Sequence, residues 1–275
     1  MSKSLTFLIV MILTGFMFGV EAGAQDEGAK PGSILGGPAP LTIPDLEGIE
    51  PGEIEDFCDI SLLPGEDWAF INNSDEAALD WSQPTGGVFP AHMGDPGCYI
   101  FANFNSSSGS GTTLSNWLIT PELNLGQIES CSFFTRTVTG NPFPDRLEVR
   151  ISTVGASTDV GGTALSVGDF TDLVIEINPN LQVGGYPQNW TEFVITPDVL
   201  GKIGGRIAFR YFVTDGGQLP GGINSNFIGI DTFSCKLKPI VATPIPTISE
   251  WGLVAMAGIL GIVGFIVIRR RKVAA

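Results

Sequence analysis

The chain has few of the residues on which most enzymes and metal centres depend. It contains a single histidine, His92, and no Cys-x-x-Cys pair, which argues against a zinc site. It also lacks a Gly-x-Ser-x-Gly nucleophile elbow and a Gly-x-x-x-x-Gly-Lys-Ser/Thr phosphate loop. His92 stands in a Pro-Ala-His-Met-Gly-Asp-Pro stretch and is predicted to be a loop residue, not a catalytic base. We therefore expect no enzymatic activity.

Basic residues are scarce as well. The 275 residues include 14 Lys and Arg against 29 Asp and Glu, which gives a net charge of −15. Five of these cations belong to the two chain ends, so the segment between them is more acidic still. A surface of this kind repels nucleic acid and anionic lipid, so neither is expected as a partner. The simplest role of this acidity is solubility.

The C-terminal tail, residues 239–275, has three parts in a fixed order. A short polar motif at 245–252 precedes an apolar run, and a cluster of cations follows. As a helix, residues 251–268 would extend roughly 27 Å, close to the thickness of the hydrocarbon core. Because basic flanks stay in the cytoplasm, we predict a single-pass transmembrane helix with a cytoplasmic C-terminus. The basic stop comprises Arg269, Arg270, Arg271 and Lys272.

This tail resembles the IPTL-CTERM sorting signals of Gram-negative bacteria. The matching residues are Ile245, Pro246, Thr247, Trp251 and Gly252, with Ile248 where leucine is usual. The resemblance implies that an exosortase, a membrane-embedded cysteine protease, removes the tail and releases the protein to the cell surface or the medium. The alternative is a plain membrane anchor.

The N-terminus has the pattern of a signal peptide over residues 1–24. Lys3 precedes an apolar stretch from Leu5 to Val20, and Ala22-Gly23-Ala24 offers the small-x-small pattern of signal peptidase. Cleavage after Ala24 would leave Gln25 as the mature N-terminus. An uncleaved anchor is the alternative.

Four cysteines lie in the exported region, and an even number outside the cytoplasm predicts two disulfides. Three pairings are open. We favour Cys131–Cys235 because both residues lie on the apolar face of strand-like runs, which leaves Cys58–Cys98.

Between the two terminal signals, the composition changes once. Residues 25–55 mix prolines, glycines and acids without periodicity, which predicts a flexible leader. Residues 56–238 consist of short alternating runs separated by turn residues, which predicts an antiparallel β-sandwich, a jelly roll. The serine-rich stretch Ser106–Gly111 is predicted to be a mobile hairpin loop, with a binding role as the alternative. The strand candidates are Trp68–Asn72, Tyr99–Phe104, Trp117–Thr120, Cys131–Val138, Arg146–Ser152, Leu173–Ile177, Trp190–Ile195, Arg206–Val213 and Phe227–Cys235.

A second resemblance, to the choice-of-anchor J domain, spans about Asp67 to Phe233. It implies a bacterial extracellular jelly roll related to the MAM, cleaved-adhesin and galactose-binding-like modules, a family with no settled activity. The blocks that carry it are Phe101–Asn105, Ser115–Pro121, Phe134–Thr137, Phe143–Arg150, Ser166–Phe170, Val183–Pro187, Arg206–Val213 and Phe227–Asp231.

Two sets of candidate site residues follow. Related jelly rolls often hold a structural Ca²⁺ between the first and last strands, which makes Asp56, Asp59 and Asp231 candidate ligands. The alternative is that Asp231 hydrogen-bonds a neighbouring loop. Sugar-binding sandwiches stack sugar rings on aromatic side chains, and the candidate platforms here are Trp81, Tyr186 and Trp190, with core packing as the alternative.

The leading hypothesis is therefore an exported, surface-sorted, non-enzymatic module with an adhesive, matrix or carbohydrate-binding role, whose partner would be an extracellular polysaccharide. One alternative is an extracellular glycan hydrolase that uses a pair of carboxylates across a cleft. The other is a purely structural spacer domain.

Overall fold

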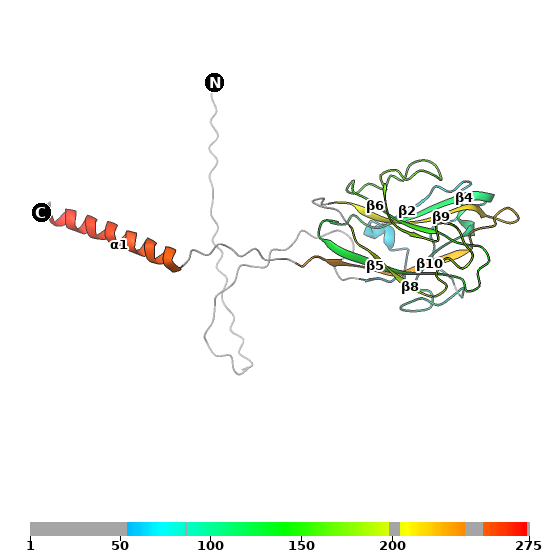
Figure 1. Ribbon diagram of the computed structural model, residues 1–275, viewed down its shortest axis with the longest axis horizontal. Helices are drawn as coiled ribbons and strands as arrows, with labels where there is room; N and C mark the ends of the chain where they lie inside the picture. Colours follow the sequence, from blue (N-terminus) through cyan, green and yellow to red (C-terminus); the bar gives the residue numbers. More distant parts are fainter. Residues whose placement is uncertain (1–53, 86, 198–203, 240–249, 274–275) are drawn as a thin grey trace, which may run out of the picture. The chain divides into compact units, whose positions relative to one another are not determined.

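The computed structural model describes residues 54–85, 87–197, 204–239 and 250–273, which form ten strands, two 3₁₀ turns and one helix (Figure 1). The strands are β1 (Ile54–Glu55), β2 (Ala69–Asn72), β3 (Ile100–Asn103), β4 (Ser110–Ile119), β5 (Ile128–Thr137), β6 (Leu147–Ser152), β7 (Asp172–Ile177), β8 (Thr191–Ile195), β9 (Arg206–Gly217) and β10 (Phe227–Leu237). The 3₁₀ turns are η1 (Leu63–Glu66) and η2 (Phe104–Ser106), and the helix is α1 (Glu250–Val273).

The strands form two antiparallel five-stranded sheets that pack face to face. Sheet A has the order β1-β10-β5-β8, with β3 also paired to β10, and sheet B has the order β2-β4-β9-β6-β7. Figure 1 shows the two layers, with β4, β6 and β9 in one and β5, β8 and β10 in the other. The predicted all-β sandwich is confirmed, and each of the nine predicted strands corresponds to an observed one. The tenth, β1, occupies the last two residues of the segment predicted to be a flexible leader.

The core lies between the sheets and follows the alternation of the strands. In β10, Ile228 and Ile230 point inward and are fully buried. Three phenylalanines from three strands meet at the centre: Phe209 packs edge-to-face on Phe133, with ring centroids 4.9 Å apart, and on Phe233, at 5.6 Å. In β5 the burial alternates from Cys131 to Thr137, and a period of two is what fixes the register of a strand.

The outer face of sheet B is also covered, which the sequence did not indicate. The strict alternation of 146–152 predicts a half-buried strand with a polar outer face, yet Glu148 on that face is only 3% exposed. The connection between β6 and β7 folds back over the sheet, where Val160 and Phe170 pack on Trp117. The prediction of a half-buried strand was therefore wrong for β6, because a long loop supplies a third layer.

The outer face of sheet A carries a smaller aromatic cluster. Phe89, from the loop before β3, packs against Tyr99 and Phe227, with ring centroids 5.1 and 5.4 Å away. These rings close over Gly229 of β10, where an added Cβ would lie 3.0 Å from the rings of Phe89, Tyr99 and Trp190. Glycine is needed here because the rings occupy the space of a side chain.

The structure contains the two expected disulfides, and their pairing is the one the sequence favoured. Cys131 of β5 lies directly opposite Cys235 of β10, so this bond joins neighbouring strands. Cys58–Cys98 joins the segment before η1 to the start of β3.

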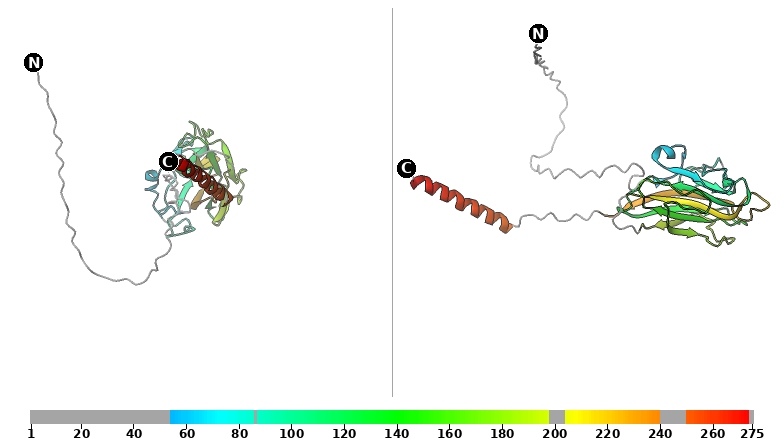
Figure 2. Two further views of the ribbon diagram at one scale, coloured as in Figure 1. Left: turned by 90° about the vertical axis from the view of Figure 1, so that its left-hand side faces the viewer. Right: turned by 90° about the horizontal axis from the view of Figure 1, so that it is seen from above.

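Both ends of the sandwich chain lie at one end of the fold. Strand β1 pairs with Phe233 and Ser234 near the end of β10, and the chain leaves at residue 239. The connection between β9 and β10, residues 218–226, lies at the other end, beyond Gly217 and Phe227 (Figure 2). We call this second end the loop end. It also includes the segments 73–80, 104–109 and 138–146.

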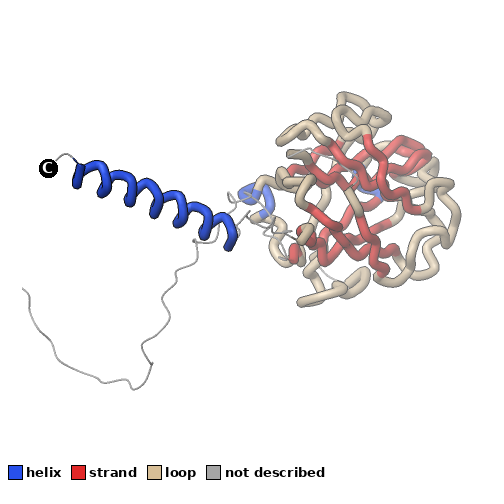
Figure 3. Tube along the Cα trace, turned by 60° about the vertical axis from the view of Figure 1, so that its left-hand side comes forward, coloured by secondary structure: helices blue, strands red, loops and turns tan. Residues whose placement is uncertain are grey.

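Helix α1 is apolar on all sides, and Figure 3 shows it in blue as one continuous helix. Its segment Gly252–Arg270 has a mean hydropathy of 2.2 over 19 residues and is long and apolar enough to cross a membrane. The helix covers the predicted span 251–268 and extends past it at both ends.

Candidate functional site at the loop end

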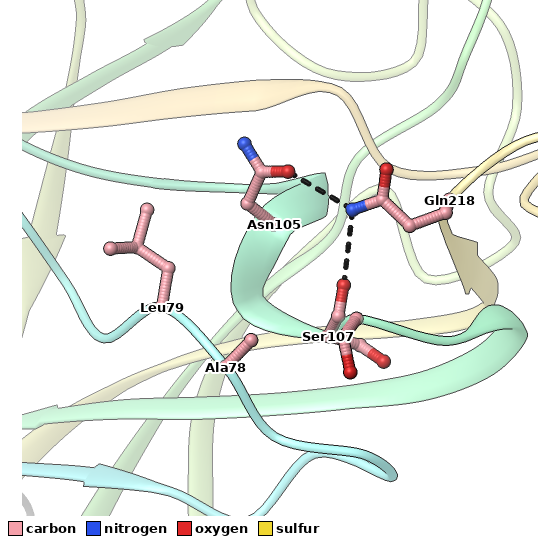
Figure 4. A pocket seen from close by; sticks show the side chains of 6 residues that line it. Ala78, Leu79, Asn105, Ser107 and Gln218 are labelled. Atoms are coloured by element: carbon pink, nitrogen blue, oxygen red, sulfur yellow. Dashed lines mark hydrogen bonds between the residues drawn. The ribbon is translucent and has the colours of Figure 1, made fainter.

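Two neighbouring cavities open at the loop end. The wider recess, shown in Figure 4, has a volume of about 500 Å³ and the narrower cavity about 170 Å³. Gln218 lines both. The recess is completed by Ala78, Leu79, Asn105, Ser107 and Ser108. The narrow cavity is completed by Phe104, Phe143, Gly217, Leu219, Gly222, Ser225 and Asn226. None of these described lining residues is an acid, a base or a histidine, so neither cavity has the carboxylate pair that a glycan hydrolase needs.

The side chains of Gln218 and Asn105 are hydrogen-bonded to each other, and that of Gln218 is also bonded to the backbone. The Gln218 Nε2 donates to Asn105 Oδ1 at 3.0 Å and to the Ser107 carbonyl at 3.2 Å. Figure 4 shows the two amides turned toward one another, with the Gln218 oxygen and the Asn105 nitrogen pointing away from the pair. The backbone N–H of Gln218 also donates to the Gly109 carbonyl at 2.7 Å. The recess is therefore preorganised by contacts within the protein.

A buried carboxylate holds the wall of the narrow cavity. Asp145 is completely buried and accepts hydrogen bonds from Tyr211 Oη at 2.6 Å, Thr137 Oγ1 at 2.6 Å and the Asn226 N–H at 2.7 Å. Asn141 Nδ2 donates to the same carboxylate at 2.8 Å. Burial raises the pKa of Asp145 above its ordinary value, although the hydrogen bonds from Asn226, Thr137 and Tyr211 act in the opposite direction. A carboxylate that accepts from one strand of each sheet, β5 and β9, and from two loop segments ties both sheets together at the loop end.

Asn141 connects the Asp145 carboxylate to Phe143 and Asn226, two residues that line the narrow cavity. Its Oδ1 accepts from the Phe143 N–H at 2.9 Å and from Asn226 Nδ2 at 2.7 Å. The backbone carbonyl of Asn226 accepts from the Phe104 N–H at 3.0 Å. Asn226 therefore joins three segments of the loop end while its side chain lines the cavity.

The backbone at the loop end is held in conformations that most residues avoid. Glu76, Asp215 and Ser225 have φ values of 48°, 51° and 69°. Such conformations cost energy, persist only where the surroundings enforce them, and cluster at functional sites. Gly217, with φ of 82°, lies so close to the Gly109 carbonyl that an added Cβ would be 2.3 Å from its oxygen. At this position two loops pack backbone against backbone, so a side chain on residue 217 would not fit.

Two of the three predicted aromatic platforms are core residues. Trp81 is 3% exposed and donates from Nε1 to the Asn116 carbonyl, and Tyr186 is 2% exposed with its hydroxyl 2.7 Å from Thr135 Oγ1. Both predictions are wrong because the loops that contain these residues fold inward. Trp190 is half-buried on the outer face of sheet A, where its Nε1 donates to the Pro90 carbonyl.

The three candidate calcium ligands do not form a metal-binding group within the part of the chain that the structure describes. Asp231 is buried, and its Oδ2 accepts from the backbone N–H groups of His92 and Met93 at 2.7 and 3.2 Å, which is the loop-bonding alternative. Asp56 and Asp59 each accept from the backbone two residues further along the chain. Calcium at these residues stays a prediction that no contact supports. His92 is an exposed loop residue, with Nδ1 2.9 Å from Thr232 Oγ1.

The amides of the loop end were not predicted as site residues. The sequence places Asn105 beside the serine-rich stretch that we predicted to be a mobile hairpin loop, yet Ser106 and Ser107 are 1% and 0% exposed. Ser107 Oγ donates to the Asp75 carbonyl at 2.6 Å, which fixes the turn to the segment after β2. Clustered Asn, Ser and Gly in several loops was the available signal, but single-sequence patterns do not show that these loops meet.

Comparison with known families identifies the tail. Residues 243–272 match the family model described as the IPTL-CTERM motif. The predicted resemblance of the tail is thereby confirmed. The first residues of this match, and the sorting residues Ile245, Pro246, Thr247 and Ile248, lie outside the described residues, whereas Trp251 and Gly252 lie in the first turn of α1.

Solved structures with a similar arrangement of strands include two domains of Lys-gingipain from Porphyromonas gingivalis W83. The K3 cleaved adhesin domain is 19% identical with a TM-score of 0.45, and covers 67% of this chain and 97% of its own length. The K1 cleaved adhesin domain is 19% identical with a TM-score of 0.44, at 63% and 92% coverage. A family 11 carbohydrate-binding module from Clostridium thermocellum is 12% identical with a TM-score of 0.37, at 66% and 92% coverage. No curated protein matches the chain.

Proposed function

We propose that this chain is a surface-sorted, non-enzymatic binding module that contacts an extracellular polysaccharide through its loop end. The observation that carries the proposal is the pair of adjacent cavities lined by fixed amides and carbonyls, at the end of the sandwich opposite to the exit toward the tail. Preformed cavities with a few oriented polar groups are typical of ligand sites. The absence of titratable side chains among their described lining residues favours binding over hydrolysis.

The proposal includes the route to the surface. Signal peptidase removes residues 1–24, the helix holds the chain in the inner membrane with its C-terminus in the cytoplasm, and an exosortase then removes the tail. The match of 243–272 to the IPTL-CTERM motif and the apolar helix support the steps at the tail, and the N-terminal sequence pattern supports the step at signal peptidase. With the cut close to Pro246–Ile248, the mature protein would contain the segment 25–55 and the sandwich domain, 56–238, and would lack the apolar helix.

A blocking substitution tests the loop end. Ser108 is exposed, lines the recess, and is held by its backbone N–H to the Glu76 carbonyl at 2.9 Å, so Ser108→Trp should fill the recess without removing that bond. Ser61, an exposed residue just before η1 at the other end, provides the matched control Ser61→Trp. The assay is binding of purified full-length protein in detergent to an array of bacterial and plant polysaccharides.

The wild type and Ser61→Trp should bind the same polysaccharides, and Ser108→Trp should lose them. Binding that survives Ser108→Trp, or no binding at all, would refute the proposal. Release of reducing sugar from any bound polymer would favour the hydrolase alternative.

A further inference from the structure

We propose that the loop end recognises an uncharged, hydroxyl-rich sugar residue and discriminates against charged ones. The inference rests on the proposed function and names the chemistry of its ligand. It follows from the direction in which three amide side chains are held, from the charges behind them and from the rings beside them.

The orientation of each amide is set by partners that can act in only one way. The Ser107 carbonyl can only accept, so the group of Gln218 that faces it must be Nε2, and Gln218 Oε1 faces away. In the narrow cavity, Asn141 Nδ2 donates to the Asp145 carboxylate. The Phe143 N–H can only donate, so the atom of Asn141 that accepts from it must be Oδ1. Asn226 must then offer Nδ2 to Asn141, which leaves Asn226 Oδ1 for the cavity.

Three polar groups therefore remain for a ligand. Gln218 Oε1 and Asn226 Oδ1 are acceptors, and Asn105 Nδ2 is a donor, and none of the three makes a hydrogen bond with another described residue. A carboxylate or sulfate, which only accepts, would satisfy the donor and face two acceptors. An ammonium group, which only donates, would leave the donor unmet. A hydroxyl both donates and accepts, so a polyol matches all three.

The charges around the cavities also favour an uncharged ligand over an anionic one. The carboxylate of Asp145 is hydrogen-bonded to both Asn141 and Asn226, so it lies directly behind the wall of the narrow cavity. Glu76 lies beside Gly109 at the edge of the recess. No lysine or arginine is among the described residues that line either cavity. An anionic sugar would approach nearby carboxylates without a cation to pair with, which is unfavourable.

Apolar contacts complete the match. Phe104, Phe143 and Leu219 line the narrow cavity, and Leu219 is 68% exposed at its rim. Sugar rings carry C–H faces that pack on such side chains while their hydroxyls meet amides. At about 170 Å³ the cavity is smaller than the roughly 300–1,000 Å³ typical of sites for drug-sized ligands. It therefore takes a single ring of a longer chain, and the recess takes its neighbour.

The test removes the amide of Gln218 while keeping its length. Gln218→Met loses Oε1 and Nε2, and the backbone bond from its N–H to the Gly109 carbonyl holds the loop. The matched control is Gln127→Met, an exposed residue next to β5 at the opposite end whose side chain makes no hydrogen bond with another described residue. A second variant, Phe143→Leu, keeps the cavity apolar but removes the ring. Full-length protein in detergent is titrated with four polymers: a neutral glucan, a neutral galactan, a polyuronate and a polymer of amino sugars.

We expect a neutral polymer to bind with an affinity that hardly changes between 20 and about 500 mM salt, because no ion pair forms. Gln218→Met should weaken it about tenfold, as for the loss of a hydrogen bond, and Phe143→Leu should weaken it as well. Gln127→Met should bind as the wild type. Circular dichroism and the melting temperature confirm that each variant is folded.

The outcomes separate the two proposals. If the polyuronate or the amino-sugar polymer binds more tightly than both neutral polymers, and Gln218→Met abolishes that binding, the inference of a neutral ligand is overturned and loop-end binding stands. If no polymer binds, or if Gln218→Met and Ser108→Trp leave binding unchanged, both proposals are overturned.

Discussion

Replacing Glu148 with glutamine should destabilise the sandwich, because this carboxylate is the shared partner of three arginines on the outer face of sheet B. The carboxylate of Glu148 contacts three guanidinium groups, those of Arg150 at 2.7 Å, Arg146 at 2.9 Å and Arg210 at 3.0 Å. The side chains of Glu148 and Arg210 are 3% and 1% exposed. Removing the negative charge would leave the three cations together under the loop that connects β6 and β7.

The magnitude follows from burial. Removing one partner of a buried ion pair typically costs about 3–5 kcal/mol, because the remaining charge is left without compensation. Glutamine keeps the volume and one acceptor oxygen, and Arg210 also donates to Ser115 Oγ at 2.9 Å and to the Ala164 carbonyl at 2.6 Å. We therefore expect the lower end of the range, about 3 kcal/mol. The rings of Phe212 and Trp117, which lie 3.7 and 4.8 Å from the Arg210 guanidinium, remain in both proteins.

The assay is urea unfolding of full-length protein with its disulfides intact, followed by tryptophan fluorescence. Glu176→Gln is the matched control. Glu176 lies on the neighbouring strand, its side chain is 30% exposed, and its only ion pair among the described residues is with Arg146, at 3.7 Å. Exposed pairs of this kind contribute about 0–1 kcal/mol. A free energy of unfolding that falls by less than about 1 kcal/mol in Glu148→Gln would refute the account of the network.

The same comparison has a defined dependence on pH. Burial alone would raise the pKa of Glu148, but the hydrogen bond from Arg150 and the charges of Arg210 and Arg150 outweigh it, so the pKa lies below its ordinary value of 4.5. A carboxyl group with a lowered pKa contributes stability above its unfolded-state pKa and loses it as the pH falls through the folded-state value. The difference between the wild type and Glu148→Gln should therefore shrink as the pH is lowered below 4.5. A difference that widens there would contradict this sign.

Three other changes have outcomes that can be measured directly. Replacing both Cys131 and Cys235 with alanine removes a disulfide between residues 104 positions apart in the sequence. On the chain-entropy estimate, the free energy of unfolding should fall by about 4–5 kcal/mol. Urea unfolding that matches the oxidised wild type would argue against it. Tyr211→Phe removes the donor 2.6 Å from the buried Asp145 carboxylate and should cost about 1–3 kcal/mol in the same assay, and a neutral result would show that the carboxylate does not need this hydroxyl. Pro246→Ala should slow exosortase processing and enrich a membrane-bound form that keeps the tail, visible as a larger band in cell fractions; wild-type surface protein that retains the tail would show that the tail is only an anchor.

The layers of the fold could be predicted from sequence because they depend on local periodicity. In β9 the inward positions Ile207, Phe209, Tyr211 and Val213 alternate along one face, and this pattern alone gives the strand and its buried side. The tail was predictable for a similar reason, since a continuous apolar run followed by arginines needs no tertiary context. Strand β1 was missed because two residues paired with β10 carry no period of their own.

The candidate site was beyond the reach of such patterns because it is made of loops from distant parts of the chain. Gln218 and Asn105 are separated by 113 positions, and Asn226 and Asn141 by 85. No periodicity joins them, and amides in loops read as turn residues. The same limit explains the wrong prediction for Trp81, because only the fold shows that its indole reaches a carbonyl of β4.

The position of the disulfide between β5 and β10 has a mechanical consequence. Strand β10 begins at the loop end and finishes where the chain leaves toward the tail. While the tail still holds the chain in the membrane, tension between a ligand at the loop end and that anchor would therefore run along this strand. Backbone hydrogen bonds to β5 and to β3 lie across that direction and would be loaded in shear, where many must break together. Peeling from the C-terminal side would stop after Lys236 and Leu237, because Cys235 is bonded to Cys131. Beyond that point the force is shared between β10 and β5. The sandwich therefore resists extension along β10, the direction in which a bound ligand would pull on the membrane-held chain.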